Sequence, residues 1–139
     1  MRILIPSLVL IAAIGLYINY GGVNSSVVEA EKSKALVNIE IPAELSGLAV
    51  IGKRGFEKNC AACHGKNAVG QDGVAPPLVH KIYEPSHHGD ESFQRAVALG
   101  VRAHHWPFGN MPAVEGVTRG DVKMITAYIR ELQRANGIN

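Results

Sequence analysis

The chain has 139 residues, a formal net charge of +2 and a charged fraction of 19%. Its length fits one domain of ordinary size, and no basic run points to nucleic acid. The sequence also has no glycine-rich phosphate loop and no Ser/His/Asp grouping, so it lacks the usual signs of a nucleotide-binding protein or a serine hydrolase.

Residues 1–20 form an apolar stretch that carries a single charge, Arg2. A bilayer-spanning helix needs about 20 mostly apolar residues and a signal-peptide core about 7 to 15, so length alone leaves both open. Tyr17 and Tyr20 suit a membrane interface, and no strong cleavage site follows them. We therefore expect an uncleaved single-pass anchor in a bacterial inner membrane, with Arg2 in the cytoplasm and the rest of the chain in the periplasm.

Residues 21–41 are polar and rich in glycine, serine and mixed charges, which is typical of a flexible linker. Such a linker would let the domain reach a partner, although a disordered leader without function has the same composition. The alternation in Ile39-Glu40-Ile41 indicates an extended segment that packs on the domain. We expect the folded domain itself to span residues 42–139.

The first helix of the domain is predicted to begin near Pro42, with Glu44 in its first turn. Residues at three- and four-residue steps define one face of this helix: Leu48, Ile51, Gly55, Phe56 and Cys60. Gly52 and Gly55 each cost a helix about 1 kcal/mol relative to alanine. We therefore expect another helix to cross closely over these two small residues.

A Cys-x-x-Cys-His motif occupies residues 60–64 and is typical of covalent attachment of a c-type haem. Two thiols at this spacing reach the two vinyl groups on one porphyrin edge, and the following imidazole faces the iron. A thioredoxin-like pair would need a preceding strand, and a zinc site would need two further ligands, because Cys60 and Cys63 are the only cysteines. The sequence predicts one haem c bound through both, with Phe56 beside the ring.

The middle of the domain is rich in histidine, at His80, His87, His88, His104 and His105. One interpretation is a second metal site formed by the two His-His pairs, and the other is a set of surface or propionate-contacting residues. The second is favoured, because no His-x-x-x-His or carboxylate spacing organises them. Trp106 and Arg102 are candidate donors to a haem propionate, since a half-buried carboxylate needs partners.

Two more helices are predicted after this region. The first begins with Asp90 as its N-cap candidate, runs to Leu99 and stops at Gly100. The second begins near Thr118 and presents apolar residues at helical spacing: Val122, Ile125, Ile129 and Leu132. Two basic residues near its end suit the helix dipole: Arg130 and Arg134.

Taken together, these motifs resemble a class I c-type cytochrome over roughly Ser46 to Arg134. The resemblance is carried by Gly52, Phe56, Cys60-Ala61-Ala62-Cys63-His64-Gly65, Ala75-Pro76-Pro77-Leu78, Asn110-Met111-Pro112 and Tyr128. It implies an all-α fold of three to five helices around one covalently bound haem. In this fold the first and last helices cross near one haem edge, here near Tyr128.

The resemblance also implies the ligands of the iron. His64 would be the proximal ligand, its second ring nitrogen bonded to the Pro76 carbonyl, and Met111 would supply the sixth ligand through sulfur. A backbone carbonyl that accepts a hydrogen bond from the second ring nitrogen orients metal-bound histidines in general. His104 and His105 are the alternatives for the sixth position, and a core methionine is the alternative role for Met111.

A haem with both axial positions filled suggests a single-electron carrier rather than an enzyme, with no small-molecule substrate. We expect redox proteins as partners: a quinol-oxidising complex or dehydrogenase as donor, and a terminal oxidase as acceptor. Lys53, Lys58 and Lys66 either steer an acidic partner or form an ordinary solvated surface. Two alternatives are a fixed subunit of a larger membrane oxidoreductase, and a haem enzyme or gas sensor with a labile sixth ligand.

Overall fold

The computed structural model describes residues 35–139, so the predicted anchor and most of the predicted linker lie outside the described residues. The described part is helical and has no strand, only two isolated bridge pairs, which confirms the all-α fold. None of its helices is long and apolar enough to cross a membrane. Its elements are α2 (Gly47–Asn59), α3 (Ala61–His64), η1 (Lys66–Ala68), η2 (Lys81–Tyr83), α4 (Asp90–Leu99) and α5 (Arg119–Ala135).

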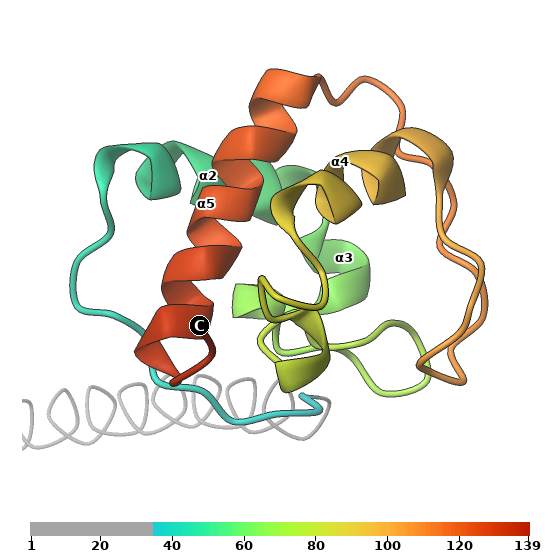
Figure 1. The fold of residues 1–139 in the computed structure, drawn as a ribbon, viewed down its shortest axis with the longest axis horizontal. Coiled ribbons are helices and arrows are strands. Elements are labelled where there is room, and N and C mark those ends of the chain that lie inside the picture. The colour runs from blue at the N-terminus through green and yellow to red at the C-terminus, as the bar shows by residue number, and fades with distance from the viewer. Residues whose placement is uncertain (1–34) are drawn as a thin grey trace, which may run out of the picture. The chain divides into compact units, whose positions relative to one another are not determined.

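The core of the domain forms where α5 crosses α2 (Figure 1). A Cβ atom added at Gly52 would lie 1.8 Å from the carbonyl oxygen of Met124, and one at Gly55 would lie 3.0 Å from Cγ1 of Ile125. The expectation of a close helix crossing over these glycines is therefore confirmed. The closest approach falls at Met124, one turn before the expected position at Tyr128.

The predicted start of α2 is wrong, and its predicted buried face is wrong in part. The helix begins at Gly47 rather than near Pro42, because the Ser46 backbone N–H and hydroxyl bind the Glu131 carboxylate of α5 and fix the helix start there. Leu48 and Ile51 of the predicted face are 51% and 50% exposed, whereas Gly55 and Phe56 of that face do lie against α5. The buried residues of the helix are Ala49, Gly52 and Phe56. Small residues such as Ala49 and Gly52 are needed where the two helix backbones lie so close together.

Helix α5 follows its prediction closely. Thr118 and Asp121 form a reciprocal capping box, in which each side chain bonds the backbone N–H of the other. The four apolar residues predicted to face the core are all buried. Arg134 lies in the last turn, as a dipole role requires, whereas Arg130 lies before that turn and is buried, which corrects its predicted role.

Arg130 instead joins α5 to the segment between η2 and α4. Its guanidinium donates to the carbonyl oxygens of Tyr83 at 2.7 Å and His88 at 2.5 Å. It also donates to the carboxylate of Asp90 at 2.9 Å. Asp90 is the first residue of α4 and not its N-cap as predicted, because the extended residue before the helix is Gly89.

The segment before α2 lies against the domain in an extended conformation. The backbone N–H groups of Leu36 and Val37 both donate to the Val69 carbonyl, at 3.1 and 3.3 Å. The backbone of Glu40 exchanges two hydrogen bonds of 2.8 Å with the Asn136 side chain. Because the compact unit starts at Ala35, part of the sequence assigned to the linker is attached to the domain.

Candidate functional site

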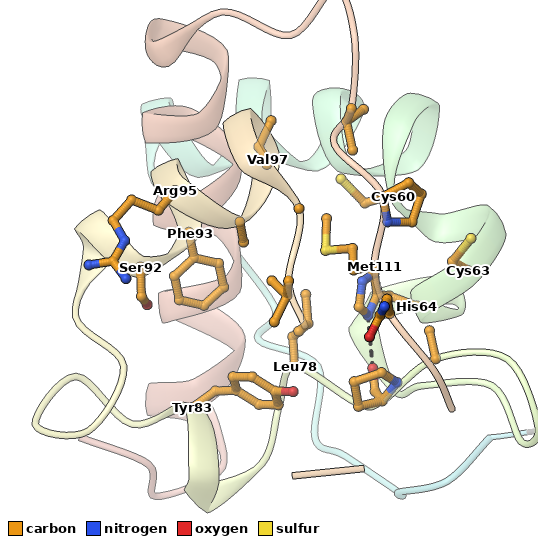
Figure 2. Close-up of a pocket in the computed structure, with 18 of the residues that line it drawn as sticks. Cys60, Cys63, His64, Leu78, Tyr83, Ser92, Phe93, Arg95, Val97 and Met111 are labelled. Carbon is orange, nitrogen blue, oxygen red and sulfur yellow. Dashed lines mark hydrogen bonds between the residues drawn. The ribbon is translucent and has the colours of Figure 1, made fainter. Parts of the chain in front are cut away.

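A cavity of about 610 Å³ opens between α3, α4, α5 and the loop that precedes Met111. Its volume lies within the range of about 300–1,000 Å³ that is usual for cofactor sites. The lining is mainly apolar, as Figure 2 shows in part. Apolar residues that line it are Leu78, Phe93, Ala96, Val97, Val114, Val122, Ile125 and Ile129.

The Cys-x-x-Cys-His motif lies at one side of this cavity. Helix α2 ends before Cys60, and the chain makes one further helical turn, closed by a 2.9 Å bond from the His64 N–H to the Cys60 carbonyl. This turn places both thiols and the imidazole along the pocket, where Figure 2 shows them. Gly65, with φ of +72°, then ends the helix.

The environment of Cys60 does not suit thiol redox chemistry. Burial, and to a smaller extent the neighbouring Cys63, raise the pKa of the Cys60 thiol to about 11. Reactive redox cysteines need the opposite shift, because the thiolate is the nucleophile. The site therefore disfavours a thioredoxin-like role for the pair.

His64 is held in the orientation that a metal ligand needs. Its Nδ1 lies 2.9 Å from the carbonyl oxygen of Pro76, so Nδ1 carries the proton and Nε2 keeps a free lone pair. Burial lowers the pKa of His64, which favours the neutral imidazole. The contact that the resemblance implied is thus present in the structure.

Met111 lines the same cavity from a different segment (Figure 2). Two reciprocal backbone hydrogen bonds of 2.9 Å pair Met111 with Val101 and fix the loop. Gly100 makes this pairing possible, because a Cβ there would lie 2.6 Å from the Met111 carbonyl oxygen. Met124, the other methionine among residues 35–139, does not line the cavity.

Two polar side chains of the lining have a buried atom without a hydrogen-bond partner in the described part of the chain. They are the indole Nε1 of Trp106 and the hydroxyl of Thr126. Buried donors are normally satisfied, so an unpartnered N–H at a cavity indicates a ligand that accepts a hydrogen bond there. Together with the apolar walls, the thiols and His64, this fits a haem with its propionates. Arg102 also lines the cavity and is exposed.

Some of these residues carry no signal in the sequence. Thr126 lies among the apolar residues of α5, and Tyr83 lies in a short turn, yet both line the cavity. Burial raises the pKa of Tyr83, and the nearby Trp106 indole opposes that shift. The indole has no hydrogen bond of normal geometry to this hydroxyl. Trp106 stands out in the sequence as the one tryptophan, whereas Thr126 and Tyr83 do not stand out.

Phe56, expected beside the haem, lies in the core and is not among the cavity-lining residues. Its ring packs on Tyr128 with centroids 5.7 Å apart.

Of the three lysines near the motif, Lys53 lies 4.0 Å from Glu57 on the same helix face. Such an exposed pair weakens the positive potential that would steer a partner.

A helical domain with a Cys-x-x-Cys-His motif at the edge of an apolar cavity defines a c-type cytochrome. The cytochrome c family model matches residues 49–133, and the chain belongs to this family. Covalently bound haem c and electron transfer follow from that membership. The chain is also 38% identical over 89 residues to the Cbb3-type cytochrome c oxidase subunit FixPc of Rhizobium leguminosarum bv. viciae, a match that covers 62% of this chain and 28% of the relative. No solved structure matches the chain.

Proposed function

We propose that this chain is a monohaem electron carrier whose iron is bound by His64 and Met111. One observation carries the proposal: an imidazole oriented by a backbone carbonyl and a loop-borne thioether line the same cavity. When bound, the haem supplies a one-electron couple of ferric and ferrous iron. Two axial ligands from the chain leave no position for a substrate, so the role is electron relay.

The surrounding residues have distinct tasks in this proposal. The Pro76 carbonyl fixes the tautomer of His64 and increases its basicity as a ligand. The Trp106 N–H is suited to donate to a propionate. The apolar walls exclude water, and thioether ligation favours the reduced iron, so both raise the reduction potential.

The proposed setting is the periplasmic face of a bacterial inner membrane, with residues 1–20 as the anchor. This part of the proposal is supported by the apolar composition of that stretch and by its single charge, Arg2. The electron donor would be a quinol-oxidising complex or a dehydrogenase, and the acceptor a terminal oxidase or similar complex.

Replacing Met111 with alanine tests the ligand set. The ferric variant is expected to lose the weak red charge-transfer band that marks sulfur ligation, and the reduced variant is expected to bind carbon monoxide at neutral pH. Met124→Ala is the matched control and retains the band, because Met124 lies outside the cavity. A band that persists in Met111→Ala would contradict the assignment.

A second candidate is a fixed subunit of an oxidase complex, which the similarity to FixPc favours. The chain spans 28% of that relative, so only the haem domain is comparable. Solubilisation of native membranes in mild detergent, followed by native electrophoresis with haem staining, separates the two roles. A free carrier migrates alone, and a fixed subunit migrates with its complex.

A further inference from the structure

Two adjacent histidines, His87 and His88, meet His105 from a later loop beside the haem cavity. One potential ligand atom from each of His87, His88 and His105 lies within 4.8 Å of the other two. The ring centroids of His87 and His88 are 4.7 Å apart. The centroid of His105 lies 5.5 Å from that of His87 and 5.3 Å from that of His88. The group joins the turn before α4 to the loop that leads to Met111.

Within this group, His88 is held in an orientation that suits a metal ligand. The Nδ1 of His88 lies 2.7 Å from the carbonyl oxygen of Ile82, so it carries the proton and Nε2 is free to bind. The carbonyl of His88 accepts a 2.5 Å bond from buried Arg130, which fixes the backbone at this point. The orientation resembles that of His64, whose Nδ1 also faces a backbone carbonyl.

We propose that His87, His88 and His105 bind one divalent transition-metal ion, with zinc as the best-fitting example. Imidazole is a preferred ligand of zinc, and three protein ligands plus water complete a tetrahedral site. Zinc–nitrogen bonds of about 2.0–2.1 Å place ligand nitrogens about 3.4 Å apart. His87 and His105 are exposed, so their side chains can rotate to close the present spacing.

Contact with the haem does not account for the whole group. His88 and His105 line the cavity, but His87 does not. His87 and His88 lie in the turn before α4, and His105 lies in the loop that leads to Met111. A bound ion would hold these two segments together.

Calorimetric titration of the full-length ferric holoprotein with zinc chloride tests the site. We expect one zinc ion per chain in the wild type, and affinity at least about tenfold lower in His87→Gln and in His105→Gln. His80→Asn is the control, because His80 lies outside the group and asparagine can still accept the Ile82 N–H bond. Its zinc affinity is expected to equal that of the wild type.

Either of two titration results would overturn the site: no zinc binding at micromolar concentrations, or equal affinity in the wild type and His87→Gln. The red charge-transfer band provides an independent readout. It should persist in both glutamine variants if these histidines bind zinc and not the haem iron. Loss of the band in His105→Gln would assign that residue to the haem and refute the zinc site. Loss of the band in Met111→Ala tests the sixth ligand of the haem iron and is independent of the zinc site.

Discussion

Tyr128 connects the last helix to the turn that follows the haem-binding histidine. Its side chain is 1% exposed, packs on Phe56, and donates a 3.0 Å hydrogen bond to the side chain of Asn67. Asn67 has a φ of +56°, a conformation that asparagine tolerates better than most residues. One hydroxyl thus stabilises a turn that lies three residues beyond His64.

Tyr128→Phe removes this hydrogen bond and keeps the ring. We expect the free energy of unfolding of the holoprotein to fall by about 1 kcal/mol, since a partly buried hydrogen bond is lost and the Asn67 side chain loses its partner. Guanidinium titration followed by circular dichroism measures the change. An unchanged unfolding midpoint would show that the hydroxyl contributes nothing.

The same residue sets a dependence of stability on alkaline pH. Burial, and then the charge of Glu57, raise the pKa of Tyr128 from 10.0 to about 12. Between these values the unfolded chain loses the proton while the folded chain keeps it, so the contribution is full below pH 10 and is lost as pH rises to about 12. The difference in unfolding free energy between wild type and Tyr128→Phe should shrink across this window. A constant difference would contradict the shifted pKa.

Among the helices, α5 was predictable and α2 only in part, for a physical reason. In α5 the large apolar residues face the core and the capping box marks the start, so hydrophobic periodicity and burial agree. In α2 the buried face is made of small residues and one phenylalanine, while Leu48 and Ile51 face outward. Periodicity of large apolar residues therefore misplaces Leu48 and Ile51, whereas Phe56 and the two glycines correctly indicate the face that α5 crosses.

Gly52→Ala tests that crossing. The added methyl would meet the Met124 backbone at 1.8 Å, and neither backbone can move without repacking, so we expect a loss of about 3 kcal/mol in unfolding free energy. Gly47→Ala is the matched control, because nothing lies within 4 Å of its Cβ position. Chemical denaturation of the two variant holoproteins measures their free energies of unfolding. Equal stabilities would mean that the helices are not in close contact at Gly52.

At the scale of the whole molecule, the motifs that lie within short stretches of sequence were recognisable, and the connections between them were not. His64, Pro76 and Met111 were named from local motifs, and all three line the cavity. Arg130 was assigned to the helix end, because no local pattern shows that it meets the carbonyls of Tyr83 and His88. The histidine group likewise exists only through folding. The assignment of residues 1–20 as a membrane anchor stays a prediction.

Arg130→Lys tests how far this connection supports the fold. Lysine keeps the charge but not the guanidinium geometry that serves two carbonyls and a carboxylate, so we expect a loss of about 2 kcal/mol. Arg134→Lys, at an exposed position of the same helix, should change stability by less than about 0.5 kcal/mol. Thermal unfolding of both variants provides the comparison. Equal destabilisation would refute the special role of Arg130.

The central claim is that one haem is covalently bound through Cys60 and Cys63. Mass spectrometry of the denatured full-length protein, with peptide mapping, tests it most directly. The account predicts the mass of the polypeptide plus one haem, with the haem on the peptide that contains both cysteines. A polypeptide mass without haem, whether with two free thiols or with a disulfide, would contradict it.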